Sequence, residues 1–206
     1  MFSPKPRILI INGMKTPIDP DFRIMCEYSE AVARNDPSGL AGIASRFFFA
    51  GLPDISEKAA ADAMKDFYVA GLAPSGGGKS SAMESPEPSF DFEEDEAYFF
   101  AAFLSEYGID LNTVKLHWFD FCALFRGLPD ECRLKRIISI RSESTNDIKS
   151  AAERSRVTRL KRIFALKRKG RQRFKDVHER DNAMLAEIER IHREAREKGV
   201  RTVDGK

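Results

Sequence analysis

The segment that most constrains the fold is residues 116–125, which read Leu-His-Trp-Phe-Asp-Phe-Cys-Ala-Leu-Phe. Arranged as a helix, this segment is apolar on nearly every side, and a Gly-Leu-Pro sequence follows it closely. A helix that is apolar all round lies in the interior of a protein, so other elements must surround it. We therefore expect it in the middle of the core, with the Trp118 indole buried among Phe100, Phe121 and Phe125.

Two further helices are predicted on either side of this segment. Apolar residues recur at helical spacing over 98–107, and Gly108 is the residue type that commonly ends a helix. Asp91 is a suitable N-cap for this first helix, because the macrodipole favours acids at a helix N-terminus. Asp130 is expected to cap the second of these two helices, which follows the central segment in the chain. Residues 90–142 are thus predicted to form a compact three-helix core.

The N-terminal end of the chain is predicted to form a β-hairpin. Residues 7–11 are rich in β-branched side chains, and residues 14–18 form the second arm. The Asn12-Gly13 pair between them is typical of a tight type I′ turn. A hairpin of two strands is marginally stable by itself, so this one must pack on helices.

Three helices are expected after the hairpin. The first begins at Asp19-Pro20-Asp21, which supplies a cap and a first-turn proline, and it ends near Asn35. The second follows directly, and the third is capped by Asp54 or Ser56. The fold class predicted from all these patterns is mainly α, with a small N-terminal β-hairpin packed on helices, a central helical core and a long charged C-terminal helix.

Residues 74–89 are predicted to be a flexible linker, because they are rich in Gly, Ser and Pro and show no apolar periodicity. Residues 73–80, Ala-Pro-Ser-Gly-Gly-Gly-Lys-Ser, loosely fit a phosphate-binding loop. Such a loop needs a buried strand before it and a helix starting at the lysine. The preceding residues have the pattern of an amphipathic helix, and the following ones cannot start a stable helix. We therefore interpret Lys79 as a linker residue, without a bound nucleotide.

The net charge of +2 conceals a strong separation of charge along the chain. Residues 84–96 contain seven acids and no base, whereas residues 154–175 contain eleven bases and no acid. The basic run lies on the long charged helix that is expected from about Asn146. It favours a solvated helix face or an acidic protein partner, with nucleic acid bound through its phosphates as the alternative.

The C-terminal end of the chain carries an apolar stripe with the three-four spacing of a coiled coil. A single exposed helix cannot bury such a stripe, so it is expected to pair with itself, with the core or with a partner helix. The predicted partner-binding residues are the stripe and two neighbouring bases: Phe174, Val177, Met184, Ile188, Ile191, Arg168 and Arg171.

No catalytic, cofactor-binding or metal-binding set is predicted, so the chain is not expected to be an enzyme. His117 and Cys122 are five positions apart on one predicted helix and point in different directions, without a third group to orient them. No pair of Cys or His has the spacing of a zinc site. Three cysteines, an odd number, are typical of reduced thiols in a cytosol.

Four organisational units are predicted: 1–73 as a hairpin with helices, 74–89 as the linker, 90–145 as the central helical core, and 146–206 as the charged C-terminal helix with a coiled-coil-like end. No apolar run approaches the length of about 18 residues that a membrane span requires. We expect an intracellular protein with no membrane partner.

The central block resembles a known family. The strings Tyr107-Gly108-Ile109-Asp110-Leu111 and Leu116-His117-Trp118 are its most specific part. They are similar to the gene-product-fifteen family of long-tailed bacteriophages and prophages, which is encoded between tail-tube and tape-measure genes in phages of Gram-positive hosts. The resemblance covers roughly residues 7–166. Phe119 departs from it, because a second Trp often stands at that position in the family.

The resemblance implies a role in phage tail morphogenesis, as in siphoviruses. The function it suggests is that of a non-enzymatic tail-assembly chaperone that binds the tape-measure protein, with tail-tube subunits as further partners. Self-association is expected from the C-terminal stripe. Such a chaperone would act in the bacterial host cytoplasm and be absent from the mature virion. The alternative hypothesis is a nucleic-acid-binding protein that uses the basic 154–175 helix.

Overall fold

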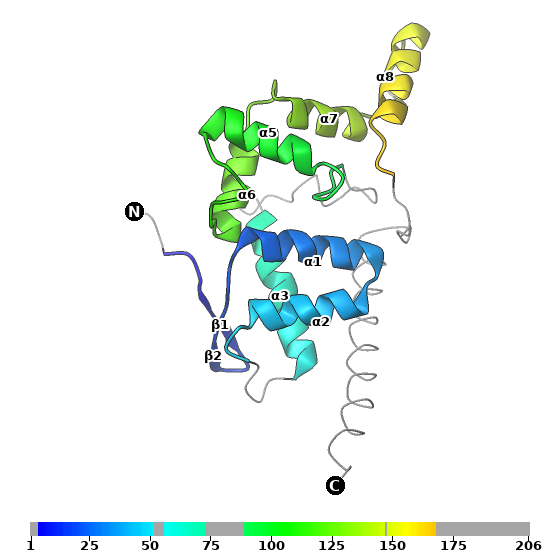
Figure 1. The fold of residues 1–206 in the computed structure, drawn as a ribbon. Coiled ribbons are helices and arrows are strands. Elements are labelled where there is room, and N and C mark those ends of the chain that lie inside the picture. Colours follow the sequence, from blue (N-terminus) through cyan, green and yellow to red (C-terminus); the bar gives the residue numbers. More distant parts are fainter. Residues whose placement is uncertain (1–3, 52–55, 73–88, 147, 168–206) are drawn as a thin grey trace.

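The computed structural model describes residues 4–51, 56–72, 89–146 and 148–167. These residues form helices and a single antiparallel pair of strands, which confirms the predicted mainly α fold. Figure 1 shows the hairpin at one side of the molecule and three helices below, α1 (Phe22–Arg34), α2 (Pro37–Phe47) and α3 (Glu57–Leu72). The helices α5 (Glu96–Tyr107), α6 (Trp118–Gly127) and α7 (Arg133–Ser142) lie above, and α8 (Ala151–Ile163) projects at the edge. No helix within these residues is long and apolar enough to cross a membrane.

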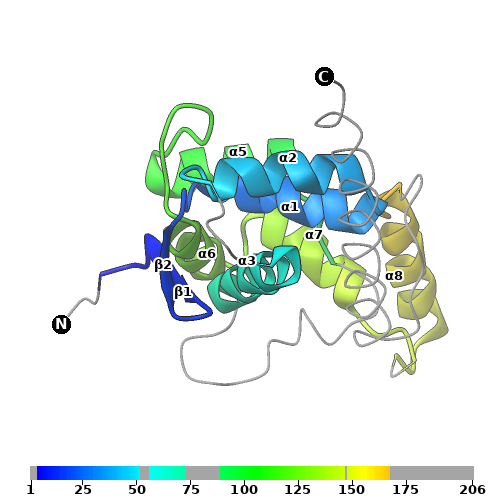
Figure 2. The same cartoon turned by 90° about the horizontal axis from the view of Figure 1, so that it is seen from below.

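The predicted hairpin is confirmed. Strand β1 (Ile8–Ile11) pairs with β2 (Met14–Pro17), and Ile11 lies opposite Met14 beside the turn. Asn12 and Gly13 have φ angles of 50° and 81°, the positive values that a type I′ turn requires. Figure 2 shows that the hairpin lies against α3 and α6 rather than standing alone.

Helices α1 (Phe22–Arg34) and α2 (Pro37–Phe47) are joined by a tight connection. Asn35 ends α1 in the left-handed conformation, with φ 54°, and the Asp36 side chain then caps α2 by accepting the Gly39 N–H at 3.0 Å. The expected end of the first helix is therefore confirmed. The expected first-turn proline is wrong, because Pro20 precedes the N-cap residue Asp21.

Helix α3 (Glu57–Leu72) begins after Ser56, whose hydroxyl accepts the Ala59 N–H at 3.3 Å. Of the two predicted caps, Ser56 thus performs the role, and Asp54 lies outside the described residues. Helix α5 (Glu96–Tyr107) ends at Gly108, which has a φ of 67°. The Ile109 N–H reaches back to the Phe103 carbonyl at 3.2 Å, as in a Schellman motif.

Two predicted N-caps are wrong. Asp91 caps a turn over residues 92–95 by accepting the Glu93 and Glu94 N–H groups, and α5 starts only at Glu96. Helix α7 (Arg133–Ser142) starts after Cys132, not after Asp130. In both places an extra turn separates the acid from the helix, and such a turn is not visible in the capping pattern alone.

Helix α6 (Trp118–Gly127) is joined to the start of α1 by backbone hydrogen bonds. The Phe22 N–H donates to the Leu116 carbonyl at 3.0 Å, and the Trp118 N–H donates to the Pro20 carbonyl at 2.7 Å. Residues Asp21 and His117 thereby form an isolated antiparallel bridge. This bridge fixes the two helix starts side by side.

One hydrophobic cluster draws on both the N-terminal helices and the central helices, across the predicted linker. Trp118 is fully buried in it. Its indole stacks on Tyr68 and Phe121, with ring centroids 5.2 and 5.7 Å away, and meets the Phe92 ring edge-on at 6.2 Å. The predicted burial of Trp118 is confirmed. Of its three predicted neighbours, however, Phe121 is the one that stacks on it, and α3 supplies a neighbour that the sequence did not indicate.

The charged helix after the core is shorter than predicted. Helix α8 (Ala151–Ile163) begins at the Ser150 cap and not near Asn146, and residues 164–167 are not helical. Its buried residue is Val157, which is 1% exposed. The helix stops where the Phe164 carbonyl accepts the Arg141 Nε–H at 2.6 Å, a contact that holds this carbonyl against the core. The predicted continuous helix over 154–175 is therefore wrong at Phe164.

Candidate interaction groove

A groove of about 720 Å³ lies between α1 and α2 on one side and the start of α5 on the other. Its lining also includes the loop after α5, at residues 111 and 112. We call it the α1–α5 groove. Its apolar lining consists of Phe22, Ala31, Ile43, Phe92, Phe99, Phe100, Leu111 and Phe121.

The floor of the groove is a layer of packed aromatic rings. Phe22 of α1 stacks on Phe121 of α6 with centroids 4.7 Å apart and planes 11° from parallel. Phe99 lies 6.0 Å from Phe121 and 5.2 Å from Phe92. Phe100 is half-buried, so it presents part of its ring to the groove. Phe22, Phe92, Phe99 and Phe121 are buried, so Phe100 is the aromatic residue of the lining that keeps part of its ring exposed.

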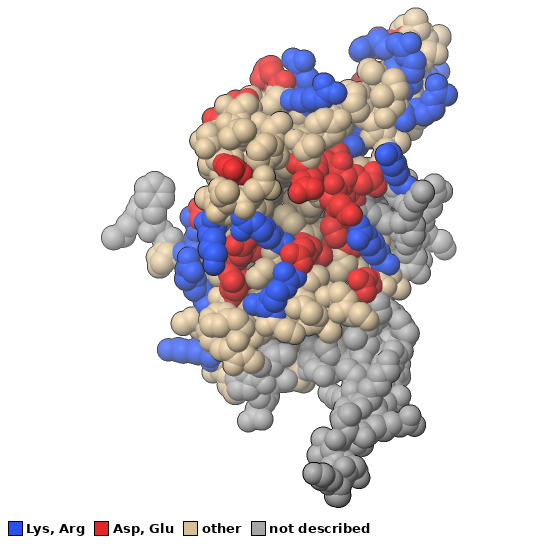
Figure 3. Space-filling view, in the orientation of Figure 1, with Lys and Arg blue, Asp and Glu red and all other residues tan. Residues whose placement is uncertain are grey.

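The rim of the groove is charged and has an acidic excess. Five acids and three bases line it: Glu27, Glu30, Asp36, Glu93 and Glu96, with Arg23, Arg34 and Arg46. Figure 3 shows acidic side chains gathered over the space between α1 and α5, with basic side chains beside them. Two ion pairs, Arg46 with Glu27 and Arg34 with Glu93, neutralise part of this charge. Both pairs are about half exposed, so they contribute little stability.

Arg23 fixes one end of the groove. Its guanidinium donates to the Leu111 carbonyl at 2.8 Å and to the Val114 carbonyl at 2.6 Å, and it pairs with Asp21. The loop after α5 is thereby fastened to the start of α1. Since Arg34 at the other end of α1 pairs with Glu93 before α5, the groove runs along α1, and α5 runs antiparallel to it.

The opposite end of the groove adjoins a buried ion pair. Arg141 at the end of α7 binds Asp95 with both guanidinium ends, at 2.5 and 2.9 Å. The Arg141 side chain is 10% exposed and the Asp95 side chain is 1% exposed. The same guanidinium also donates to the Ser89 and Phe164 carbonyls, at 3.2 and 2.6 Å. One side chain thus joins α7, the turn before α5 and the end of α8.

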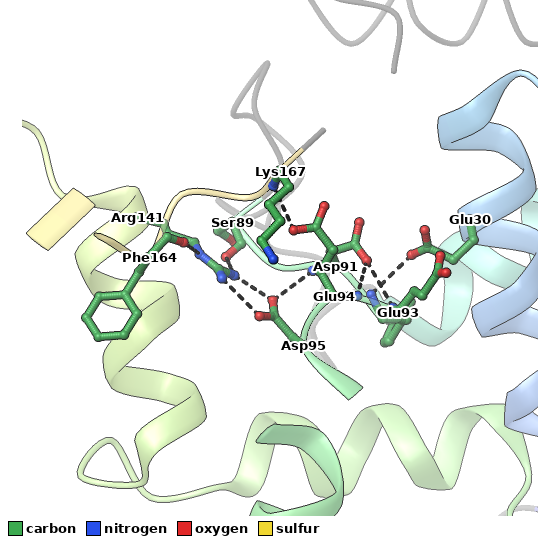
Figure 4. Close-up of polar contacts among 10 residues, drawn as sticks. Glu30, Ser89, Asp91, Glu93, Glu94, Asp95, Arg141, Phe164 and Lys167 are labelled. Atoms are coloured by element: carbon green, nitrogen blue, oxygen red, sulfur yellow. Dashed lines mark hydrogen bonds and ion pairs between the residues drawn. The ribbon is translucent and has the colours of Figure 1, made fainter. Parts of the chain in front are cut away.

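The acidic turn before α5 connects this ion pair to the groove (Figure 4). Asp95 accepts the Asp91 N–H at 3.1 Å, and Glu30 of α1 accepts the Phe92 N–H at 3.1 Å. Glu94, next to the groove residue Glu93, accepts the Lys167 N–H at 2.7 Å. Residues following α8 therefore reach the acidic end of the groove.

His117 acts as the N-cap of α6. Its Nδ1 accepts the Phe119 N–H at 3.1 Å, and its Nε2 lies 2.9 Å from the Pro6 carbonyl, to which it donates. Burial lowers the pKa of His117 below its ordinary value, which favours this neutral tautomer. Both ring nitrogens are thus bonded to the main chain. The arrangement supports the interpretation of His117 as a structural residue rather than a base for Cys122.

The environments of Cys26 and Cys122 favour the protonated thiol. Burial raises the pKa of Cys122 and, with nearby negative groups, that of Cys26 well above the ordinary range. Cys26 lines the groove as a half-buried side chain. In the described part of the chain, no group of three His, Cys, Asp or Glu residues could hold a metal ion.

The predicted partner-binding residues all lie outside the described residues: Phe174, Val177, Met184, Ile188, Ile191, Arg168 and Arg171. Their role stays a prediction. Residues 73–80, the segment that resembles a phosphate-binding loop, also lie outside them, and what precedes this segment is the helix α3, as the sequence indicated. The groove itself was not predicted from the sequence, although two of its floor residues, Phe100 and Phe121, were expected in the core.

The comparisons with known proteins agree with the resemblance found in the sequence. A family model described as "Bacteriophage Gp15 protein" matches residues 61–166, just over half of the chain. The match begins within α3, later than the residue 7 expected, and it ends at the expected residue 166, before the C-terminal extension. No curated protein and no solved structure matches the chain significantly. The chain belongs to the Bacteriophage Gp15 protein family.

Proposed function

We propose that this protein is a non-enzymatic chaperone of phage tail assembly and that it binds a helical segment of the tape-measure protein in the α1–α5 groove. Membership of a bacteriophage family supports the setting. The resemblance to a family encoded beside the tape-measure gene supports the client. On this proposal the protein acts in the host cytoplasm and leaves before the virion is complete, and tail-tube subunits are further partners.

The groove is the observation that carries the proposal. An amphipathic helix binds a protein by placing its apolar face in a hydrophobic groove, and charged residues at the rim select its orientation. The α1–α5 groove has an aromatic floor of Phe22, Phe99 and Phe100 and a charged rim. A long tape-measure helix that awaits polymerisation of the tube exposes the kind of apolar stripe that such a floor would cover.

The test is co-expression with the adjacent tape-measure product, scored by the amount of soluble complex. Phe100→Asp places a charge on the groove floor at a half-buried position, and it is expected to abolish complex formation. Leu104→Asp is the matched control, because Leu104 is 45% exposed on the same helix and does not line the groove. Equal complex formation by the two variants, with both proteins folded, would refute the groove as the client site.

Nucleic-acid binding is the second candidate function, because α8 exposes several bases. Arg154, Arg156, Arg159 and Arg162 are all exposed on this helix. Two of them are engaged locally: Arg154 donates to the Ile148 carbonyl at 2.5 Å, and Arg156 pairs with Glu153 at 2.6 Å. If α8 binds phosphates, retention on DNA should fall steeply with salt, and Arg159→Glu with Arg162→Glu should weaken it. Tail assembly predicts no such effect.

A further inference from the structure

We propose that the α1–α5 groove is also the docking site of the chain's own C-terminal segment, residues 168–191, in the same molecule. The client and this segment would then compete for one groove. The inference names a regulator of the proposed client site, so it rests on the proposed function for its consequence. The docking itself does not depend on that function.

The position at which the described chain ends supports this occupant. The Lys167 N–H donates to the Glu94 carboxylate at 2.7 Å, and Glu94 adjoins Glu93, which lines the groove. Figure 4 shows Lys167 beside this acidic turn, with Glu30 of α1 on its far side. The Arg141 bond to the Phe164 carbonyl anchors the preceding residues against the core. The described chain therefore ends at Lys167, beside the acidic end of the groove.

The charges of the segment and of the groove are complementary. The next eight residues, 168–175, contain five bases and no acid. They follow Lys167, whose N–H is bound to Glu94 between Glu93 and Glu96, and the groove rim has an excess of acids over bases. Opposite charges attract, and they set the direction in which the segment approaches.

The apolar stripe comes next in the sequence, in the order that the groove requires. Beyond its acidic end, the groove has the aromatic floor that includes Phe99 and Phe100. Residues 168–173 can span at most about 20 Å when extended, which is enough to bring Phe174 over this floor. From Arg23 to Arg34, α1 is about 16 Å long, whereas a helix over the whole stripe, 174–191, would be about 26 Å long. The stripe is therefore long enough to cover the groove and to extend past its Arg23 end.

A tethered segment is a strong competitor even when its intrinsic affinity is low. A short connection to the core gives the segment an effective concentration in the millimolar range at the groove. A client therefore displaces it only if the client's affinity for the groove is higher than that of the segment as a free peptide. The segment would shield the aromatic floor until a client of sufficient affinity displaces it. Its expected effect is to suppress weak and non-specific binding in the groove.

The test uses the full chain with a photo-crosslinking residue in the groove. Phe100→p-benzoylphenylalanine and Asn112→p-benzoylphenylalanine place the probe on the floor and at the exposed far end, and the Asn112 variant does not disturb the core. After irradiation, mass spectrometry of the monomer is expected to show crosslinks to peptides from 168–191. Ile10→p-benzoylphenylalanine is the control, since Ile10 is 73% exposed on the hairpin and should give no such crosslink.

A mixture of isotopically light and heavy chains distinguishes docking within one molecule from docking between two. Crosslinks that join light to heavy chains, or the absence of crosslinks to 168–191 from both groove positions, would overturn the inference. Ile188→Asp should abolish the crosslinks and increase client capture. Reduced client capture by Ile188→Asp would show that the segment binds the client itself, which also overturns the inference.

The two proposals fail in different ways. If the crosslinks are absent but Phe100→Asp still loses the tape-measure complex, the groove binds the client and the C-terminal segment docks elsewhere. If the crosslinks form but Phe100→Asp keeps the complex, the segment occupies the groove and the proposed client site is wrong.

Discussion

Gly71 of α3 lies against the indole of Trp118 so closely that a Cβ at position 71 would overlap the indole nitrogen and its neighbouring carbons. The indole cannot move away, because its Nε1–H donates to the Tyr68 carbonyl at 3.0 Å and its ring is stacked on Tyr68. The Arg126 guanidinium also donates to the Gly71 carbonyl at 2.7 Å. The end of α3 is thus held against α6 at the one residue that has no side chain.

Gly71→Ala is expected to destabilise the protein by about 1–3 kcal/mol, the usual cost of forcing an extra group into a packed core. Gly42→Ala is the matched control, because a Cβ on Gly42 of α2 meets nothing within 4 Å. Alanine in a helix interior is favoured over glycine by up to about 1 kcal/mol, so the control should be neutral or stabilising. Chemical denaturation measures both, and equal stabilities of the two variants would contradict the close contact.

Trp118→Ala is expected to lose about 3–5 kcal/mol, since it removes a fully buried indole from the middle of the core. In a domain with about 5–15 kcal/mol of total stability, this loss brings the protein close to unfolding. Phe49→Ala serves as the control, because Phe49 is 63% exposed. An unchanged thermal midpoint for Trp118→Ala would show that the ring is not buried in solution.

Arg141→Met is expected to cost about 3–5 kcal/mol, because it leaves the Asp95 carboxylate buried without its partner. The double variant Arg141→Met with Asp95→Leu should lose less than the sum of the two single variants, since no charge then remains buried. Arg156→Met is the comparison for an exposed pair and should be nearly neutral. Additive losses in the double-mutant cycle would show that Arg141 and Asp95 are not coupled.

His117 should make stability depend on pH below neutrality. Burial holds its folded-state pKa below the unfolded value of about 6.5. The unfolded chain therefore binds the proton more readily, so this contribution to stability is complete above the unfolded pKa and is lost as the pH falls through the folded pKa. Denaturant unfolding followed from neutral pH downward should show the loss.

His117→Asn provides the matched variant for this pH dependence. An asparagine oxygen can accept the Phe119 N–H and keep the cap of α6, but it does not titrate. The variant should therefore be less sensitive than the native protein to acidification just below pH 6.5. The same acid sensitivity in both proteins would assign the effect to other groups.

Local signals in the sequence were sufficient for most elements. The Asn12-Gly13 turn, the left-handed residues Asn35 and Gly108, and the Ser56 cap each act through their own backbone or through neighbours within a few residues. Such features are encoded over short stretches, so a pattern of residue types reveals them. The N-caps predicted at Asp91 and Asp130 were wrong, because an additional turn separates each of these acids from its helix.

Residue types at regular or short spacing were enough to predict the mainly α class, the hairpin, the aromatic centre of the core and the family resemblance. Which distant residues meet could be seen only in the folded chain. The contact of Gly71 with Trp118, the four bonds of Arg141 and the assembly of the groove from α1, α2 and α5 join residues far apart in the chain. Periodicity shows that a face is buried, but it does not show against what, because many pairings of apolar faces bury similar area. The choice among them depends on close packing and on polar groups that are satisfied in one arrangement.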